Sequence, residues 1–386
     1  MTLRLLCVHQ GYELYGSDRA FVESVAALRA AYPTADIEVI LPCHGPIVAH
    51  VEKLATHVSI EPIWVLRRHD VLKIMAFGWA RLIPACRRAV ARMRAADLVY
   101  INTVVIVDFL LAARFFPGKV LVHIHEIPEG VARSIFRALL RWSRAELIFN
   151  SRATKSVFAM PAATTQHVVY NAIAGPTDVA PLDYDASRPL RLLMVGRINR
   201  IKGQDLLVDA LAKVPPDLRS RLEVRIVGGT FANDAARERI LRDRVQTEQL
   251  GAIVRFEPFH TDMQPLYRWA DVVCVPSRRP ESLGRVAIEA MSFGRPVIAA
   301  AIGGLVEIVE DRVTGRLFVP NNASELCALI VDSIANPAVW RDYGLAARQR
   351  YLTVFGERGF TQIQAVAQAL VSRQTAGRCS PGMHQC

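Results

Sequence analysis

Short apolar runs alternate with longer segments of helical periodicity along the chain. In the first half, the apolar runs occupy residues 3–9, 37–42, 97–103, 119–125, 146–151 and 167–171. Between the first two runs, residues 17–32 (SDRAFVESVAALRAAY) carry apolar positions at helical spacing. Runs that are apolar throughout are typical of strands buried on both faces. The alternation therefore predicts a parallel sheet with helices on both sides.

The pattern stops once and then restarts. Residues 172–189 (AIAGPTDVAPLDYDASRP) are rich in Pro, Gly and Asp and show no periodicity, which is typical of a linker. New apolar runs follow at 190–196, 222–229, 252–259, 271–277, 296–300 and 315–320. We therefore predict two α/β domains, at 1–175 and 190–373, with a linker at 176–189 and a tail at 374–386. We expect the last helix to pack back on the first domain.

Composition narrows the class of protein. The apolar fraction of 52% and the charged fraction of 22% indicate a folded globular protein, and the net charge of +11 suits an anionic partner. The basic residues form no separate tail, which argues against a nucleic-acid partner. The most membrane-like window, 98–116, contains Asn102, Asp108 and Arg114, so we expect no membrane span.

The seven cysteines are scattered and include no C-x-x-C pair. This usage is typical of reduced thiols, so we expect a cytoplasmic protein. Zinc ligation needs paired Cys and His spacings, and the sequence offers none, so no metal is expected.

Two strand-to-helix turns of the second half carry candidate chemistry, because open parallel sheets bind ligands beyond the carboxyl ends of their strands. In VGRINRIKGQDLLVDAL (195–211), Gly196 permits a close turn, and Arg197 and Lys202 precede a helix that starts near Gly203. A helix start with a guanidinium and an ammonium suits a diphosphate. Solvated loop cations explain Arg197 and Lys202 equally well. The spacing matches neither a dinucleotide fingerprint nor a G-x-x-x-x-G-K-[ST] phosphate loop.

The second turn lies in SRRPESLGRVAIEAMSFGRPVIAA (277–300). Glu281 falls in the loop and Glu289 on the following helix. A carboxylate with two acceptor oxygens can bind the hydroxyls of a sugar or a ribose. The backbone N–H groups of Ser282, Leu283 and Gly284 lie at the helix start, where they suit a phosphate. Glu289 alone also fits an ordinary acid on a helix surface.

Several motifs together resemble a known family. They are ESLGRVAIEAM (281–291), VGRINRIKG (195–203), AIGGLVEIVEDRVTGRLFVP (301–320), YGSDRAFVES (15–24), HIHEIPEG (123–130), NSRATKSVF (150–158) and VVYNAI (168–173). In this order they resemble the retaining glycosyltransferases of family 4, which include sucrose, mannosyl and lipopolysaccharide transferases. The two glutamates match the family's E-x7-E motif. The resemblance implies the GT-B fold, with two Rossmann-like domains that face each other across a cleft.

The resemblance also implies roles for residues of the second domain. This domain is expected to hold most of a UDP- or GDP-sugar donor without a cofactor or metal. Arg197 and Lys202 are placed on the donor diphosphate, Glu281 on the donor sugar and Glu289 on the ribose.

In the first domain, the resemblance makes His125 the active-site histidine. Gly16 and Ser17 lie where backbone amides approach the phosphate or the acceptor. The family usually has two adjacent glycines there, and this chain has only Gly16. Glu126 is expected to orient the acceptor or to cap the next turn. His123, two residues before His125, is expected to be a core histidine.

Two basic stretches bear on the acceptor. Residues 67–94 interleave eight Lys or Arg residues with apolar ones, including Leu72, Ile74, Phe77 and Trp79, and 133–144 place Arg133, Arg137, Arg141 and Arg144 on one helical stripe. Such stripes suit an interfacial helix on anionic lipid, which would make the enzyme peripheral at the cytoplasmic membrane face and the acceptor lipid-linked. Ordinary amphipathic helices with their apolar side in the core are an equally good interpretation.

The sequence therefore predicts a retaining glycosyltransferase that moves a sugar from a nucleotide-sugar to a saccharide or lipid-linked saccharide in cell-surface polysaccharide or glycolipid biosynthesis. A nucleotide-sugar epimerase on the same fold is the alternative enzyme. A basic nucleic-acid-binding protein is the third and weakest candidate, because it depends on net charge alone.

Overall fold

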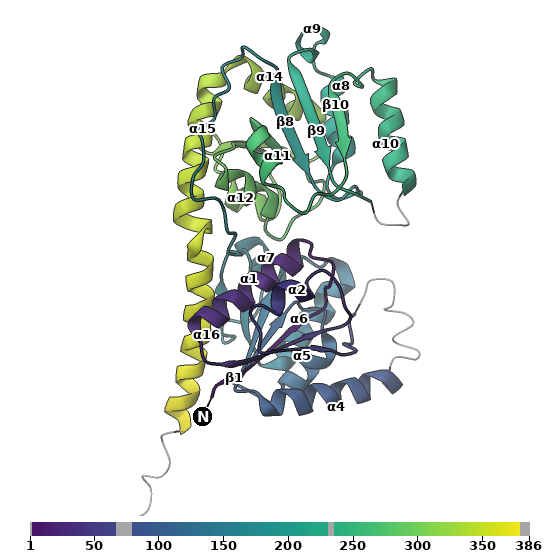
Figure 1. Ribbon diagram of the computed structural model, residues 1–386. Helices are drawn as coiled ribbons and strands as arrows, with labels where there is room; N and C mark the ends of the chain where they lie inside the picture. Colours follow the sequence, from purple (N-terminus) through teal and green to yellow (C-terminus); the bar gives the residue numbers. More distant parts are fainter. Residues whose placement is uncertain (1, 67–78, 231–234, 379–386) are drawn as a thin grey trace, which may run out of the picture. The chain divides into compact units, whose positions relative to one another are not determined.

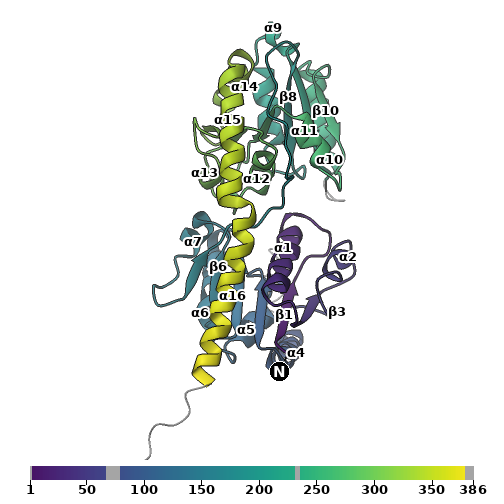
Figure 2. The ribbon, with the colours of Figure 1, turned by 60° about the vertical axis from the view of Figure 1, so that its left-hand side comes forward.

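The computed structural model describes residues 2–66, 79–230 and 235–378. It divides into two compact units, one formed by residues 1–172 with 357–386 and the other by residues 173–356. Figure 1 shows the elements of both units in sequence colours, and Figure 2 shows them after a rotation. Residues 67–78, which form the first part of one predicted basic stretch, and the end of the predicted tail lie outside the described residues.

The first unit is built on a parallel sheet in the order β3-β2-β1-β4-β5-β6-β7. Its strands are β1 (Arg4–His9), β2 (Asp36–Leu41), β3 (His57–Ile60), β4 (Leu98–Asn102), β5 (Val120–Ile124), β6 (Glu146–Phe149) and β7 (Gln166–Val168). Its helices are α1 (Gly16–Ala31), α2 (Val48–Val51), α4 (Trp79–Ala95), α5 (Val107–Ala113), α6 (Gly130–Ser143), α7 (Arg152–Phe158) and α16 (Glu357–Arg378). The predicted strands are all present, and β3 is an additional strand.

Alternate residues of its strands enter two separate cores. Leu5 and Cys7 pack on one face of the sheet among residues of α1 and α16, whereas Leu6 and Val8 pack on the other face among residues of α4, α5 and α6. Helix α16, drawn in yellow, lies beside α1 in both ribbon views. The two-sided cover explains why these strands are apolar throughout.

The second unit repeats this plan with the strand order β10-β9-β8-β11-β12-β13, and its paired strands are parallel. Its strands are β8 (Leu190–Val195), β9 (Leu222–Val227), β10 (Val254–Glu257), β11 (Val272–Val275), β12 (Val297–Ala300) and β13 (Gly315–Phe318). Its helices are α8 (Gln204–Ala212), α9 (Pro216–Arg219), α10 (Ala235–Thr247), α11 (Gln264–Trp269), α12 (Arg285–Ser292), α13 (Leu305–Ile308), α14 (Ala323–Ala335) and α15 (Pro337–Arg350), followed by a π-helical turn at Tyr351–Phe355.

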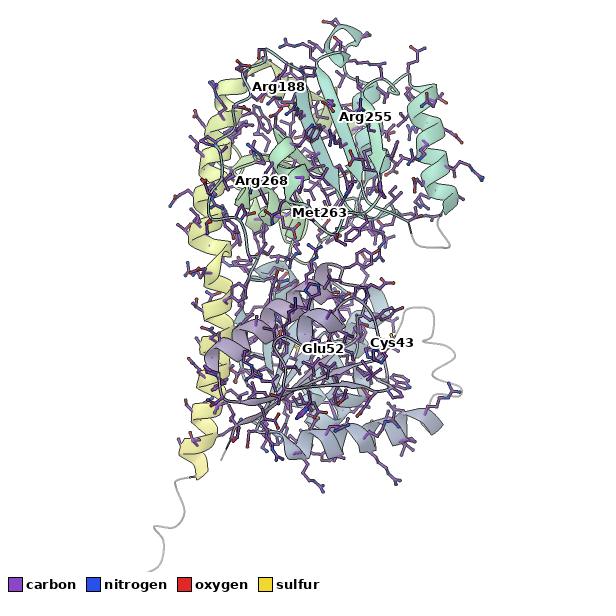
Figure 3. All side chains as sticks on the ribbon, in the orientation of Figure 1. Cys43, Glu52, Arg188, Arg255, Met263 and Arg268 are labelled. Carbon is purple, nitrogen blue, oxygen red and sulfur yellow. The ribbon has the colours of Figure 1, made fainter. Side chains whose placement is uncertain are left out.

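The domain limits of the structure differ from those expected from the sequence. The segment predicted as a linker belongs to the second unit, where Tyr184 is fully buried and Arg188, labelled in Figure 3, forms a two-pronged ion pair with Asp271. The Pro and Gly residues of this segment suggested a linker, and the sequence did not show that Tyr184 and Arg188 attach it to the second unit. Helix α16 counts with the first unit and continues to Arg378, beyond the expected start of the tail. Its Gln374 donates to the carbonyl of Gly118 at 2.7 Å.

Both sheets change direction at one point in their strand order. In the first unit, the chain runs outward from β1 to β3 and then returns to place β4 on the other side of β1. In the second unit, β8 and β11 form the equivalent pair. Loops at the carboxyl ends of such a pair diverge and leave room for a ligand. His9 and Asn102 end β1 and β4, and Gly196 and Pro276 follow β8 and β11.

Candidate functional site

In the second unit, Glu281 lies in the loop after β11 and receives two side-chain donors. The Lys202 ammonium lies 2.8 Å from its Oε1, and the Ser277 hydroxyl donates to the same oxygen. Burial alone would raise the pKa of Glu281, but the charge and hydrogen bond of Lys202, together with Ser277, hold this pKa below its usual value. The group is therefore a carboxylate at neutral pH, and it is fixed beside a cation.

The backbone around Glu281 is equally constrained. Its carbonyl accepts from the N–H of Gly304 at 2.7 Å, and Glu281 and Gly303 form a parallel bridge. Gly284 adopts a φ of 98°, and a Cβ there would lie 2.5 Å from Leu305. The chain thus enters α12 through a turn that favours glycine. Side-chain contacts by Leu283 with a donor are not expected, because this side chain is buried in the core.

The loop after β8 brings Lys202 to Glu281. Gly203 adopts a φ of 81°, and a Cβ there would lie 2.0 Å from the carbonyl oxygen of Pro276, so the two loops pack closely. Gln204 donates from Nε2 to the carbonyls of Gly196 and Arg197, at 3.2 and 3.1 Å, and so ties the loop to the start of α8. Arg197 is half-buried in this loop.

Glu289 lies on α12 and uses both carboxylate oxygens. Arg285 Nε lies 2.7 Å from Oε1, and the hydroxyl of Tyr267 donates to Oε2 at 2.7 Å. Tyr267 is buried and stacks on Phe293. The Glu289 side chain is 16% exposed, so it is not the plain surface acid that was the alternative. Lys202 and Glu281 therefore form one cluster, and Glu289 has partners of its own.

In the first unit, His125 follows β5 and contacts a polar side chain of the neighbouring strand. His125 Nε2 lies 2.9 Å from Asn102 Oδ1, and Asn102 Nδ2 lies 3.1 Å from His9 Nδ1. His9 Nε2 continues the series to Asp18 Oδ1 at 2.8 Å. Four side chains from β1, α1, β4 and the end of β5 are thus linked in one line.

Asp18 joins this line to the first turn of α1. Its Oδ2 accepts from the N–H of Tyr15 at 3.1 Å, and Ser17 Oγ lies 3.3 Å from Oδ1. Burial alone would raise the pKa of Asp18, but His9 and the N–H groups of Tyr15 and Leu14 hold it below its usual value. Gly16 and Ser17 are exposed at the helix start.

Glu126 is engaged by the backbone that surrounds His125. It accepts from the Thr103 hydroxyl, from the N–H of Val104 at 3.4 Å and from the N–H of His125 at 3.1 Å. Thr103 holds a φ of 140°, a strained value for a β-branched residue, so these bonds maintain an unfavourable backbone at the end of β4. Burial raises the pKa of Glu126. The carboxyl thus joins the ends of β4 and β5, and its expected acceptor role stays a prediction.

His123 lies inside the unit, as expected of a core histidine. Its ring is fully buried, its Nδ1 lies 2.6 Å from the Tyr100 hydroxyl, and its centroid lies 4.0 Å from that of His125. Burial lowers the pKa of His123 to about 3, so its ring is neutral at physiological pH.

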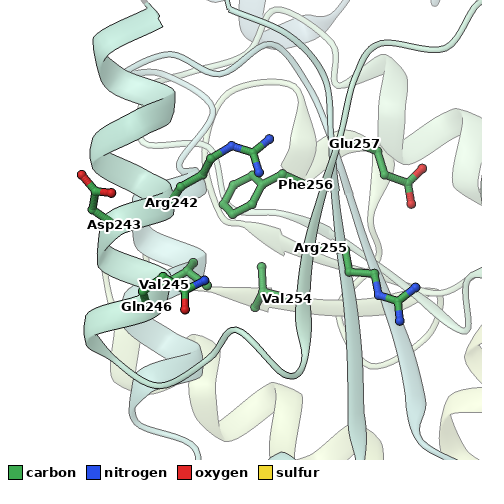
Figure 4. A pocket seen from close by; sticks show the side chains of 8 residues that line it. All are labelled: Arg242, Asp243, Val245, Gln246, Val254, Arg255, Phe256 and Glu257. Carbon is green, nitrogen blue, oxygen red and sulfur yellow. The ribbon is translucent and has the colours of Figure 1, made fainter.

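A pocket of about 460 Å³ lies elsewhere in the second unit. Figure 4 shows it between α10 and the edge strand β10, with the Arg242 guanidinium over the Phe256 ring at 4.6 Å. The residues that line it, Arg242, Asp243, Val245, Gln246, Val254, Arg255, Phe256 and Glu257, include none of the predicted site residues. We assign it no role.

Two classes of feature are not found in the part of the chain that the structure describes. Within residues 2–66, 79–230 and 235–378, no three or more His, Cys, Asp or Glu side chains gather as metal ligands would. In the same residues, no helix combines the length and apolarity needed to cross a membrane.

Sequence reasoning missed several members of both clusters. His9 and Asn102 are polar residues at the ends of otherwise apolar runs, which is the signal that could have identified them. Arg285 lies four residues before Glu289 on one helix, a spacing typical of ion pairs. Tyr267 and Ser277 carried no comparable signal.

Known proteins resemble this chain in part of its sequence and in its fold. Residues 185–350 match the family model described as "Glycosyl transferases group 1". Over the whole chain, the fold is that of GT-B glycosyltransferases. The Anabaena protein HepE in complex with UDP superposes with a TM-score of 0.78 at 24% identity, covering 96% of this chain and all of the other. Sucrose-phosphate synthase from Thermosynechococcus elongatus gives a TM-score of 0.75 at 22% identity, covering 97% and 100%.

Curated relatives match a part of the chain. A D-inositol 3-phosphate glycosyltransferase of Nocardiopsis dassonvillei is 36% identical over 195 residues, which cover 49% of this chain and 44% of the relative. One of Actinosynnema mirum is 41% identical over 141 residues, 35% and 34% of the two chains. The chain thus spans less than half the length of the curated relatives it matches. The family model and the curated relatives that this chain resembles are both of glycosyltransferases.

Proposed function

We propose that this protein is a retaining glycosyltransferase of family 4 that transfers a sugar from a nucleoside-diphosphate sugar to a saccharide or lipid-linked saccharide. The observation that carries the proposal is the contact of Lys202 with Glu281 at the carboxyl end of β11, beside the loop that holds Gly196 and Arg197. The contact joins a cation, which suits a diphosphate, to a carboxylate, which suits a sugar hydroxyl, and both lie near the start of α12, where backbone N–H groups can bind an anion.

In the proposed reaction, negative charge develops on the departing diphosphate. Arg197, Lys202 and the N–H groups of Ser282 and Gly284 would stabilise that charge, since prearranged donors act most strongly where charge appears. Glu281 would hold the donor sugar. Lys202 would then divide its three N–H donors between the diphosphate and Glu281.

Glu289 is proposed to bind the ribose of the donor. Arg285 and Tyr267 fix its carboxylate, and each oxygen keeps a second lone pair with which to accept a ribose hydroxyl. His125, in the first unit, is proposed to hydrogen-bond the sugar or the acceptor hydroxyl near the new bond. We expect no metal or other cofactor in this reaction.

Ligand-dependent stability tests the donor site. Millimolar UDP, GDP, ADP and NAD would be compared by thermal unfolding, because a ligand at a hundred times its dissociation constant adds about 2.7 kcal/mol of stability. Stabilisation by one nucleoside diphosphate is the expected result, and UDP is the first choice because the Anabaena neighbours were solved with UDP and UDP-glucose. Stabilisation by NAD alone, or by single-stranded DNA alone, would reject the proposal.

Product chemistry then separates the two enzyme classes. A transferase releases the nucleoside diphosphate and forms a glycoside, whereas an epimerase returns a nucleotide-sugar. Proton NMR of the product would give the anomeric configuration, and an inverted product would reject the retaining assignment.

We also propose a peripheral, cytoplasmic-face contact with anionic membrane through α4 and α6, which both pack on α5. Arg133, Arg137 and Arg141 are exposed on α6, Arg144 is exposed at its C-cap, and Trp142 is 49% exposed. Phe136 and Leu140 of the same helix are buried, so the apolar side of α6 belongs largely to the core. The membrane contact would therefore be mainly electrostatic.

Vesicles with and without anionic lipid would test this contact by co-sedimentation. The double variant Arg137→Glu/Arg141→Glu should lose binding to anionic vesicles. Arg239→Glu/Arg312→Glu, at exposed positions of the second unit, is the matched control and should keep it. Equal loss in both variants would mean that net charge alone drives the binding.

A further inference from the structure

The side-chain line from Asp18 to His125 has a defined order of donors and acceptors. Its members are Asp18, His9, Asn102 and His125, with Tyr100 and His123 as a branch at Asn102. Asp18, His9, Asn102, Tyr100 and His123 are all buried. A buried network of this kind is stable only when every donor faces an acceptor, so its geometry restricts where the protons lie.

Asp18, at one end of the line, determines which atoms donate and which accept along it. Its carboxylate already accepts from the backbone N–H of Tyr15 and lies near Ser17 Oγ, so it needs no cation as a further partner. A neutral His9 with its proton on Nε2 satisfies Asp18 and avoids a fully buried imidazolium. His9 Nδ1 lies 3.1 Å from Asn102 Nδ2 and 3.2 Å from the Asn102 carbonyl oxygen. With the His9 proton on Nε2, Nδ1 is an acceptor, so it accepts from the Asn102 amide and makes no hydrogen bond to the carbonyl.

The same amide determines the proton of His125. With Asn102 Nδ2 directed at His9, Asn102 Oδ1 faces two groups, His125 Nε2 at 2.9 Å and the Tyr100 hydroxyl at 3.1 Å. Both must donate. Because the Tyr100 proton goes to Asn102, His123 Nδ1 must in turn donate to the Tyr100 oxygen.

We propose that Asn102 is a positioning residue that fixes the proton of His125 on Nε2 and couples this ring to the His9–Asp18 pair. The lone pair of the neutral His125 ring then lies on Nδ1, and that atom accepts a hydrogen bond from the substrate. The role on substrate rests on the proposed function, whereas the proton positions do not. The strained backbone of Thr103, next to Asn102, is consistent with a site whose geometry is held in place.

Nitrogen NMR of histidine-labelled protein tests the proton positions without any substrate. The chain has ten histidines. The signals of His9, His123 and His125 would be assigned from their loss in single His→Gln variants. We expect protonated Nε2 in His9 and His125, and protonated Nδ1 in His123. A proton on Nδ1 of neutral His125, or a doubly protonated His9 at neutral pH, would overturn the assignment, because it requires the Asn102 amide to be reversed.

Two substitutions test the coupling. The groups that titrate or carry charge around His125 are His123 on β5, Tyr100 on β4, Glu126 in the following loop, and, through Asn102, His9 on β1 and Asp18 on α1. Asn102→Asp keeps the shape and adds a carboxylate at the ring, so the His125 titration should move upward by about one pH unit or more. Asn322→Asp, at the N-cap of α14, makes the same charge change away from the ring and is the control.

Activity gives the second measurement once a donor is known. The acidic limb of the rate profile of Asn102→Asp should move to higher pH, because His125 must be neutral to accept. Asn102→Leu should lower kcat by about tenfold or more and change the donor KM much less, as expected for lost orientation. If Asn102→Leu does not fold, Asn102→Asp alone decides the matter. A His125 titration that moves no more in Asn102→Asp than in Asn322→Asp would overturn the proposal, whether or not the protein transfers sugar.

Discussion

In the second unit, Lys202, Glu281, Arg285 and Glu289 lie on loops and on one helix and pair as opposite charges, whereas in the first unit His125 belongs to a hydrogen-bonded line of side chains, most of them at strand ends. Lys202 lies at hydrogen-bond distance from Glu281, and Arg285 lies at hydrogen-bond distance from Glu289. In the first unit, the line from His125 contains one carboxylate, that of Asp18. A charged loop side chain can exchange its protein partner for a ligand, whereas a buried hydrogen-bond network can only orient the side chains that belong to it.

This contrast explains why the two halves differ in how well sequence reveals them. Charged loop residues need a fixed spacing from a tight turn, and that spacing forms a motif such as E-S-L-G. A strand-end network needs partners that are distant in sequence, as with His9 and Asn102, which are 93 positions apart. Accordingly, the family model covers residues 185–350, within the second unit.

The largest effect is expected from Glu281→Gln, which tests whether the second unit uses its charge on substrate. Removing the carboxylate charge should reduce turnover by about 10²–10³-fold, as for loss of one prearranged group in an active site. Nucleotide affinity, measured by thermal shift with UDP, should change little. The exposed Glu310→Gln is the control, and equal turnover in both variants would remove Glu281 from the site.

Next in size is Lys202→Met, which leaves Glu281 without its cation. Loss of the partner of a nearly buried charge should lower the free energy of unfolding by about 2–3 kcal/mol at pH 7.5. In the native protein the Glu281 pKa is lowered, so its contribution to stability is complete above the unfolded pKa and is lost as pH falls through the folded pKa.

Urea unfolding at pH 7.5 and pH 5 would check this expectation. The difference between native protein and Lys202→Met should shrink at the lower pH, because Glu281 in the variant can take up a proton. Lys213→Met, at an exposed position, should show neither effect. A pH-independent difference would mean that Lys202 stabilises the loop by packing alone.

A smaller effect is expected in the first unit from Asp18→Asn. The amide still accepts from the backbone but loses the charge-assisted bond from His9, so stability should fall by about 1–2 kcal/mol at pH 7. Because the pKa of Asp18 is lowered in the folded protein, its contribution is present above the ordinary aspartate pKa of 3.8 and is lost as pH falls through the folded pKa.

Acid unfolding monitored by circular dichroism would measure this contribution. Native protein and Asp18→Asn should become equally stable as the pH falls below the folded pKa of Asp18. Glu52→Gln, an exposed acid of the same unit that is labelled in Figure 3, is the control. A stability difference that persists at low pH would point to altered packing of α1 instead of a lost charge.

The smallest effect is expected from Tyr267→Phe. The substitution removes one hydrogen bond to Glu289 while Arg285 still holds the other oxygen, so donor affinity should fall by about 1 kcal/mol or less. Titration with UDP would measure it, with Tyr343→Phe as the control on a ring that packs edge-to-face against Trp340. A tenfold or larger loss would mean that Tyr267 does more than orient Glu289.

Much of the fold was predictable because it depends on local patterns. The alternation of apolar runs and helical segments gave twelve of the strands and their parallel arrangement. Strand β3 was missed because HVSI is short, half-exposed and interrupted by polar residues, as is usual at a sheet edge. The segment 176–189 was taken for a linker because composition does not show that Tyr184 is buried or that Arg188 meets Asp271.

The candidate site was only partly predictable from the sequence. Gly196, Lys202, Gly284 and Glu281 lie at turns whose backbone demands are visible in sequence. The partners of His125 were not predictable, because only the strand order β1-β4-β5 brings His9, Asn102 and His125 together. The Arg285–Glu289 ion pair could have been predicted from the four-residue spacing of its members on one helix, and it was overlooked.

Helix α16 has a consequence for how the chain is made. Phe360, Ile363, Ala367 and Leu370 pack in the core that contains Leu5 and Phe21, and Arg373 pairs with Glu146. During synthesis, the ribosome completes the second unit before it delivers this helix to the first. The apolar face of the first unit that α16 covers therefore stays exposed while some 180 residues are translated, which takes about 10–40 s at typical bacterial and eukaryotic rates. A premature stop after Gly356 would leave the last-made unit intact and the first-made unit unfinished.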